Sequence, residues 1–353
     1  MTESKSTSIS LKDLSELDLD SPLALEWEKL VSENPASGFM QSLNWARFKR
    51  KMGLSVYHVG LFDGTKLKGG AIFYSAPNSK GAGLLAAPDG PVLPWHDSER
   101  IGECEEGLKL LLDAARSKAS SLGTMALRIA PRLPTPKPEI LSGFSRAPIA
   151  LTESKTMYLN LEPDLDTILL SVRPKARYNI GLSSRKGVTI REDSDLSVGS
   201  FYKVMEQVAR RDGFALEPLS FFRNLFDTLC PSGLARIFFA EHEGDILGAL
   251  FMVTYGGRST YLYGGTTDTK RNYMGGYSLQ WAAIKAAKED GCRHYDFWGY
   301  DPAVLPGSAY AGFSRFKSQF SGEYIELVGS LDYYFMDKLA DVVIRALNEI
   351  SVS

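Results

Sequence analysis

Apolar residues recur at helical spacing in several segments of the chain, with strand-like runs between them. Apolar positions three and four residues apart predict helices, here over 22–33, 41–53, 102–121, 165–172, 201–213, 219–229 and 278–290. Runs rich in β-branched and aromatic residues predict strands, here over 57–62, 69–75, 84–87, 124–129, 156–161, 235–242, 245–254, 258–264 and 295–298. Helices and strands mixed in this way indicate an α/β (α+β) protein.

The order of these elements repeats along the chain. In the second half, two helices precede three antiparallel strands, a helix and a last strand, an order that resembles a GNAT-type N-acyltransferase. The first half is a less regular version of the same order, after a polar stretch (1–20) that we expect to be loose. A chain of 353 residues is also longer than one core usually supports. We therefore expect two similar domains, 1–155 with a C-terminal helix in 330–353, and 156–329.

Composition and charge narrow the class of protein. With 44% hydrophobic and 23% charged residues, the chain is typical of globular proteins. The net charge is only −2, but basic residues cluster at 47–51 and again at 173–191. Local basic clusters on a nearly neutral chain indicate anionic ligands rather than a general grip on nucleic acid.

Cysteine usage and hydropathy point to a compartment. The three cysteines are scattered, without a CxxC pair, which favours a reducing environment. The acidic N-terminal stretch lacks the features of a secretory signal, and no apolar run is long enough to span a bilayer. We expect a cytoplasmic protein without stable membrane insertion.

The segment 293–317 carries the strongest candidate for a catalytic group. A strand-like run is followed by a Gly/Pro/Ser loop and by a short amphipathic stretch that places Phe316 and Lys317 side by side. Loops after strand ends are where α/β proteins commonly place their chemistry. A lysine flanked by Phe313, Phe316 and Phe320 would lie in a partly dry site, where its charge acts more strongly than in water. We therefore predict Lys317, with Phe316, as the catalytic pair.

Two neighbouring strands carry polar candidates, each with a structural alternative. Tyr261 and Tyr263 precede a Gly pair, and strand alternation predicts both rings on one face. Such a ring lines a site or packs in the core, and the strand-end position favours Tyr263 for an acceptor site. Asp296, in the strand before the loop, either orients Lys317 or a substrate amine, or accepts hydrogen bonds from its own turn.

An early helix places an indole and an ammonium one turn apart. Trp45 and Lys49 are separated by four residues and so share one helix face. That face could bind a phosphate or stack a ring. The alternative is that Trp45 packs into the core while Lys49 extends to water.

Metal and CoA sites receive little support from the sequence. The four histidines are dispersed, without HxH or HExxH spacing, so we expect no metal site. A CoA-using GNAT enzyme needs a turn that cradles phosphate at the start of a helix. The segment 271–276, RNYMGG, misses that spacing by one residue. Acyl-CoA is therefore the less favoured carrier.

Several stretches, taken in order, resemble the Fem family of peptidyltransferases (FemABX), which transfer amino acids from aminoacyl-tRNA onto the stem peptide of peptidoglycan precursors. The family's opening Gln-Ser…Trp…Lys block resembles FMQSLNWARFKRKMG, and its basic Lys-x-Arg-x-Asn-Ile segment resembles RPKARYNIGLSSRKGVTI. Its C-terminal blocks are similar in order and spacing to YLYGGTT, LQWAAIKAAKEDGCRHYDFWG and GFSRFKSQFSGE. Together these stretches cover most of residues 40–330.

The resemblance implies a fold, a donor and an acceptor. It implies two tandem GNAT-like domains, with a helix over 331–350 that returns to the first domain. The implied donor is aminoacyl-tRNA, so we expect no cofactor, and the implied acceptor is a peptide-bearing cell-wall precursor. We expect a monomer.

The resemblance also implies roles for single residues. Lys49, beside Trp45, is implied to meet the acceptor's phosphates, and Tyr263 to line the acceptor site. Phe316 and Lys317 are implied to lie where the aminoacyl end of tRNA meets the acceptor amine. A lysine suits this place, because attack of an amine on an ester builds an oxyanion that a fixed cation stabilises. The candidates for donor binding are Lys175, Arg177 and Arg271.

Two departures from the family pattern bear on the acceptor and on tRNA. Members that bind a nucleotide-sugar pentapeptide have an Arg and, four residues later, a Tyr, where this chain has Glu217 and Phe221. Glu in place of Arg removes a phosphate contact and adds repulsion, so a different acceptor is expected. The coiled-coil insertion of some members is also missing, because no heptad run is long enough.

Three functions remain open at this point. The first is a Fem-type aminoacyltransferase that extends a peptide amine. The second is an acyl-CoA-dependent GNAT N-acyltransferase of envelope or polysaccharide synthesis. The third is a binding module that keeps the double fold without turnover, which loss of Lys317 from any cavity would favour.

Overall fold

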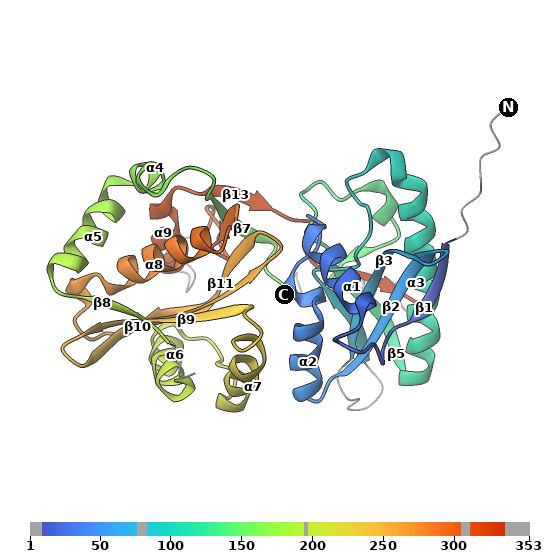
Figure 1. Ribbon diagram of the computed structural model, residues 1–353, viewed down its shortest axis with the longest axis horizontal. Helices are drawn as coiled ribbons and strands as arrows, with labels where there is room; N and C mark the ends of the chain where they lie inside the picture. Colours follow the sequence, from blue (N-terminus) through green and yellow to red (C-terminus); the bar gives the residue numbers. More distant parts are fainter. Residues whose placement is uncertain (1–8, 76–82, 194–196, 305–310, 336–353) are drawn as a thin grey trace, which may run out of the picture. The chain divides into compact units, whose positions relative to one another are not determined.

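The structure of the protein is a computed structural model that describes residues 9–75, 83–193, 197–304 and 311–335 (Figure 1). The chain divides into two compact units, Met1–Ser154 with Leu327–Ser353, and Lys155–Glu326. Within the described residues, each unit has one seven-stranded sheet. No helix in the described ranges is long and apolar enough to cross a membrane.

The sheet of the first unit has the order β1-β2-β3-β4-β5-β14-β6. Described neighbours pair antiparallel except β4 and β5, which are parallel and joined through α3. The strands are Ile9–Asp13 (β1), Ser55–Asp63 (β2), Lys66–Ser75 (β3), Gly83–Pro88 (β4), Thr124–Ala130 (β5), Ser145–Arg146 (β6) and Leu331–Tyr334 (β14). The helices are Pro22–Glu33 (α1), Leu43–Lys51 (α2) and Ile101–Leu122 (α3).

Local sequence signals explain the ends and the packing of these helices. Ser42 caps α2, because its hydroxyl accepts from the Trp45 N–H at 3.1 Å, and Gly53 follows the helix with φ +82°. Both features confirm the sequence prediction for this helix. The longest described helix, α3, packs Leu108 and Leu111 against the sheet, so the described chain carries no coiled-coil insertion.

The sheet of the second unit has the order β13-β7-β12-β11-β10-β9-β8, again with one parallel pair, β11 and β12, joined through α8. Its strands are Lys155–Asn160 (β7), Thr189–Glu192 (β8), Ala235–His242 (β9), Asp245–Tyr255 (β10), Arg258–Thr266 (β11), His294–Asp296 (β12) and Glu323–Glu326 (β13). Its helices are Leu165–Ser171 (α4), Pro174–Arg185 (α5), Val198–Asp212 (α6), Leu219–Leu229 (α7), Gly275–Glu289 (α8) and Ala311–Lys317 (α9).

Helices cover both faces of this second sheet. Alternation along β10 sends Phe251 to one face, where its ring contacts Phe201 of α6 and Phe226 of α7. Leu250 and Met252 face the other way and join a core cluster with α8. Figure 1 shows α6 and α7 below the sheet and α5 and α8 above it. The two faces therefore hold separate cores, and the candidate site lies where one of them opens.

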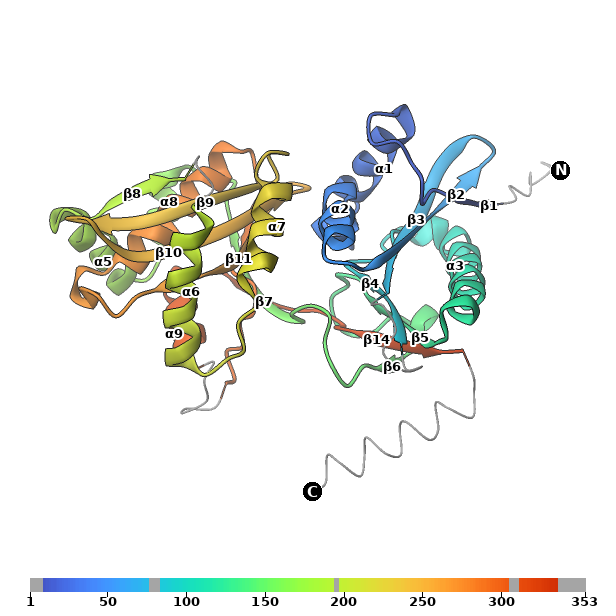
Figure 2. The ribbon, with the colours of Figure 1, turned by 90° about the horizontal axis from the view of Figure 1, so that it is seen from below.

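Two sequence predictions about the chain ends are wrong. The stretch expected to be loose contains β1, which pairs with β2 because Ile9 is buried there. The start of the expected C-terminal helix is the strand β14, inserted between β5 and β6 (Figure 2). Asp332 of β14 forms a buried ion pair with Arg128 of β5, which holds the strand in the sheet. The rest of that expected helix, 336–353, lies outside the described residues.

Candidate active site

The second unit contains a cavity of about 540 Å³ beside the free half of β11. Only the first three residues of β11, 258–260, pair with β12, so Tyr261–Thr266 lacks a described partner on that side. The cavity occupies the gap and is lined from β11, α8 and α9, with Lys175 from α5 and Arg211 from α6. Because the parallel strands β11 and β12 separate after residue 260, the sheet forms one wall of this cavity.

A β-bulge decides which tyrosine faces this cavity. Phe251 pairs with Tyr263 and Met252 with Tyr261, so Leu262 is the extra residue between them. Because consecutive residues of β10 face opposite sides, the two tyrosines also do. The prediction that both rings share one face is therefore wrong.

The two tyrosines accordingly have different surroundings. Tyr261 lines the cavity, and burial raises the pKa of its hydroxyl well above its usual value. Tyr263 lies on the α7 side, with its ring edge-on to Phe222 at 5.2 Å and to Phe221 at 6.1 Å between centroids. Burial first, and then the Glu217 carboxylate, raise the pKa of Tyr263. Glu217, Phe221 and Tyr263 therefore form one neighbourhood, separate from the cavity face.

Lys317, at the end of α9, lies behind the cavity wall rather than in the lining. Its side chain is 8% exposed, and its ammonium donates to the carbonyl oxygens of Trp298 and, at 2.9 Å, of Gly299. Trp298 and Gly299 have φ of 49° and 57°, and both direct their carbonyls at the ammonium. The nitrogen lies 5.6 Å from the centroid of the Tyr261 ring. Lys317 thus joins the loop after β12 to a residue that lines the cavity.

The three phenylalanines that flank Lys317 in the sequence lie in the cavity lining or in the core. Phe316 lines the cavity and contacts Tyr277 edge-on at 5.0 Å and Phe320 at 5.6 Å. Phe313 also lines the cavity, while Phe320 is fully buried in the core. The site is therefore partly dry, a condition that strengthens any charge held in it.

Asp296 is completely buried at the end of β12. Its carboxylate accepts from the Thr156 hydroxyl at 2.5 Å and from the Trp298 N–H at 2.9 Å. The second contact is the local turn that was the structural alternative for this residue. Asp296 therefore shapes the backbone of Trp298, whose carbonyl binds Lys317.

Gln280 of α8 is a site residue that the sequence analysis missed. It is 2% exposed, yet it lines the cavity. Its Oε1 accepts from the hydroxyl of the fully buried Tyr295 at 2.9 Å, which fixes the orientation of the amide. The Nε2 of the same amide takes no part in this contact and can donate to a ligand in the cavity. In the sequence, Gln280 is a single polar residue on a largely apolar helix face, and this pattern does not predict a side chain that lines a site.

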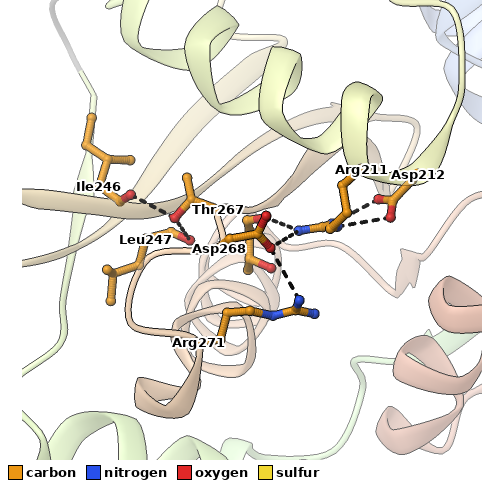
Figure 3. A network of polar contacts seen from close by, with 8 residues as sticks. Arg211, Asp212, Ile246, Leu247, Thr267, Asp268 and Arg271 are labelled. Atoms are coloured by element: carbon orange, nitrogen blue, oxygen red, sulfur yellow. Dashed lines mark hydrogen bonds and ion pairs between the residues drawn. The ribbon is translucent and has the colours of Figure 1, made fainter.

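Charged residues form the rim of the cavity (Figure 3). Arg211 holds Asp212 with two contacts of 2.9 and 3.0 Å and donates to the Thr266 carbonyl at 2.7 Å. Asp268 lies between Arg211 and Arg271, at 3.5 and 3.3 Å. The lining contains four basic side chains and one carboxylate, which Arg211 already neutralises. The rim is therefore positive on balance and suits an anionic ligand.

The predicted donor-binding residues have different positions. Lys175 and Arg271 line the cavity. Arg177 instead donates to the carbonyls of Leu170 at 2.8 Å and of Val172 at 3.1 Å, and so caps the C-terminus of α4. Arg177 therefore stabilises the end of α4 and does not line the cavity.

In the first unit, the structure favours the packed alternative for Trp45. Its ring is 3% exposed and contacts Phe39 and Phe48 at 5.0 Å each. Lys49 is half-buried, with its ammonium 5.0 Å from the Trp45 centroid. The buried Trp45 ring therefore packs against the Lys49 side chain and does not line an open surface. Among the described residues, no group of three or more His, Cys, Asp or Glu side chains could hold a metal ion.

Two family models match the chain, one in each half. The model of the FemAB family matches residues 23–131, and that of the acetyltransferase (GNAT) domain matches residues 173–317. The second match contains Lys317 and all the lining residues of the cavity except Gln319.

Known proteins are similar over almost the whole chain. The lipid II:glycine glycyltransferase of Staphylococcus aureus (strain MRSA252) is 22% identical, over 90% of this chain and 93% of that protein. The crystal structure of FemX has a TM-score of 0.81 at 20% identity and covers 91% of this chain and 98% of that one. A tandem GNAT protein from the clavulanic acid biosynthesis pathway has a TM-score of 0.55 at 14% identity, with 92% and 97% covered.

These matches agree with the geometry. The two sheets, each with one parallel pair, correspond to a tandem GNAT fold, which confirms the fold class predicted from the sequence. The protein is an acyltransferase. The FemAB family model, the similarity to a lipid II:glycine glycyltransferase and the similarity to FemX together support a Fem-type family for this chain.

Proposed function

We propose that this acyltransferase transfers an aminoacyl group from aminoacyl-tRNA to an amine of a peptidoglycan-precursor peptide. The cavity is the observation that carries the donor half of the proposal. Its basic rim suits a carrier with phosphates, and its aromatic and amide lining suits the acyl end. The similarity to a lipid II:glycine glycyltransferase supports the acceptor half.

The reaction is an aminolysis of an ester. The neutral acceptor amine attacks the carbonyl carbon, a C–N bond forms, and the carbonyl oxygen becomes an oxyanion. Collapse of this intermediate breaks the C–O bond to the ribose, whose oxygen takes up the proton that the amine releases. The products are an amide and a deacylated tRNA.

Lys317 stabilises the oxyanion in this proposal by charge. Its ammonium is held by the Trp298 and Gly299 carbonyls, and Tyr261 separates it from the cavity. A cation held in place before the reaction needs no rearrangement as negative charge develops. Gln280 supplies a hydrogen-bond donor to the bound acyl donor from the opposite wall, α8.

The acceptor is proposed to be lipid-linked rather than nucleotide-linked. Glu217 stands where the family's phosphate-binding Arg is expected, and its charge reaches Tyr263. A carboxylate there removes the phosphate contact that the nucleotide-binding members of the family are expected to make, and the similarity to a lipid II:glycine glycyltransferase then favours the lipid-linked precursor. Lys49 of the first unit is proposed to contact a phosphate of the acceptor, so Lys49→Ala should raise the acceptor KM with little change in kcat.

An acyl-CoA donor is the second candidate, and one observation favours it. The N-terminus of α8 has no side-chain cap, Gly276 in its first turn lines the cavity, and Arg271 lies just before it. Free N–H groups at a helix start bind phosphate. This arrangement fits the pyrophosphate of CoA as well as a phosphate of RNA.

A donor competition separates the two candidates. The purified protein is incubated with glycyl-tRNA or acetyl-CoA, and with lipid II or its soluble nucleotide precursor, and products are identified by mass spectrometry. We expect a mass gain on lipid II with charged tRNA only. Consumption of acetyl-CoA with inert tRNA would assign the second function, and a product on the nucleotide precursor alone would refute the acceptor assignment.

A further inference from the structure

The outer face of α5 has the charge and the exposure of an RNA-binding surface. Residues 173–186 contain five Lys and Arg residues and no Asp or Glu. Tyr178, in the middle of the helix, is 60% exposed, which is unusual for a large aromatic side chain. The Arg185 guanidinium lies over its ring, 5.7 Å from the centroid.

These groups form one stripe along the helix. At 100° per residue, Lys175, Tyr178 and Arg185 lie within an arc of roughly 80°, on a length of about 15 Å. The buried face of α5 is made by Ala176, Asn179 and Ser183, on the other side. The stripe therefore faces solvent along its whole length.

The surroundings of α5 reinforce its charge. It packs on α8 and on the short turn Ser318–Phe320 that follows α9. The segments 275–289 and 311–320 contain four further Lys and Arg residues and one carboxylate, that of Glu289 at the end of α8. A polyanion that approaches this side of the unit meets attraction over a broad area.

The stripe is continuous with the cavity. Lys175 belongs to both, since it begins the stripe and lines the cavity. A carrier whose acyl end enters the cavity would pass Lys175 and could continue along α5, which lies on the same side of the sheet as α8 (Figure 1). The described chain has no coiled-coil insertion, so another surface must hold the rest of the carrier, and α5 is a basic one that reaches the cavity.

We propose that the Lys175–Tyr178–Arg185 stripe binds the acceptor arm of the tRNA, with Tyr178 stacked on an unpaired base near the 3′ end and Arg185 on a phosphate farther along. The inference rests on the proposed aminoacyl-tRNA donor and names the surface that holds it. Unpaired bases stack on exposed aromatic and guanidinium planes without sequence preference. CoA has only a short chain of phosphates, so binding of CoA would not require a contact with Arg185, at the far end of the stripe.

The test measures binding of a hairpin RNA that copies an acceptor arm, as a function of salt. Arg185→Gln should lower the slope of log affinity against log salt by roughly one, because one phosphate contact is lost. Tyr178→Ala should weaken binding by about fivefold or more and leave the slope unchanged, because the ring carries no charge. Arg223→Gln, on the exposed side of α7, is the matched control and should change neither quantity.

A second measurement separates this inference from the proposed function. Transfer is followed from an aminoacylated hairpin and from an aminoacylated trinucleotide that ends in CCA. Arg185→Gln should reduce kcat/KM several-fold for the hairpin and leave it unchanged for the trinucleotide. Equal rates for variant and wild type on the hairpin would overturn the surface while leaving the donor intact, whereas failure of both RNAs in the wild type would overturn the donor itself. If Arg185→Gln and Tyr178→Ala weaken binding to anionic phospholipid vesicles but leave RNA binding unchanged, the stripe is a membrane-binding surface and the proposal is overturned.

Discussion

Replacement of Lys317 by Met tests the central cation of the site and the loop that it holds. The side chain is 8% exposed and donates to two consecutive carbonyls, so the substitution leaves the Trp298 and Gly299 oxygens without this donor. A hydrogen bond to a charged group contributes about 1.5 to 3 kcal/mol. We therefore expect a loss of about 3 kcal/mol in the stability of the second unit, beyond any effect on catalysis.

The same substitution removes the positive charge that lies behind the cavity wall, against the Tyr261 ring. Loss of one preorganised oxyanion-stabilising group lowers turnover by about a hundredfold or more. The assay is the rate of aminoacyl transfer at saturating donor and acceptor, measured at a temperature where thermal unfolding shows the variant to be folded. Lys317→Arg is the matched variant, since it keeps the charge and the donors, and it should recover most of the stability and part of the rate.

The expected loss of turnover and the expected loss of stability in Lys317→Met can be refuted separately. Turnover of Lys317→Met within threefold of the wild type would refute the catalytic role. An unchanged melting temperature would instead refute the role of Lys317 in holding the loop, and would show that Asp296 alone sets the backbone at Trp298.

Three further predictions concern other parts of the molecule. Gln280→Leu should lower kcat/KM for the donor by about tenfold or more, because it deletes a buried donor that faces the cavity; a change below twofold would exclude contact with the donor. Asp332→Ala should lower the free energy of unfolding of the first unit by about 3 to 5 kcal/mol, because Arg128 stays buried without its partner, and urea unfolding would measure this. Burial lowers the pKa of His58 to about 3 in the folded protein, so its contribution to stability is complete above the unfolded pKa of 6.5 and declines as the pH falls toward 3. Roughly 2 kcal/mol should be lost by pH 5, and His58→Phe should flatten this part of the stability profile.

Much of the fold could be predicted from the sequence because its signals are local. The apolar stripe of α3, the Ser42 cap and the Gly53 stop each depend on a few neighbouring residues. The same holds for Lys317, which a strand end and a run of phenylalanines marked as unusual. These features need no knowledge of the rest of the chain.

The features that the sequence did not reveal depend on distant contacts. The bulge that separates Tyr261 from Tyr263 arises in the pairing of β11 with β10, and a sequence shows only the alternation within one strand. Residues 331–334 form a strand because β5 and β6 leave a place for it. The orientation of Gln280 comes from Tyr295, fifteen positions later. In each case the deciding partner is far along the chain or on another element.

The place of β14 has a consequence for how the protein is made. The strand lies between β5 and β6, yet the ribosome produces it only after all of the second unit. Until then, β5 exposes an unpaired edge and β6 lacks its neighbour in the sheet, and such edges promote aggregation of nascent chains. A gene fragment that ends at Ser154 should therefore yield insoluble material, and supplying residues 327–353 as a separate peptide during refolding should restore solubility.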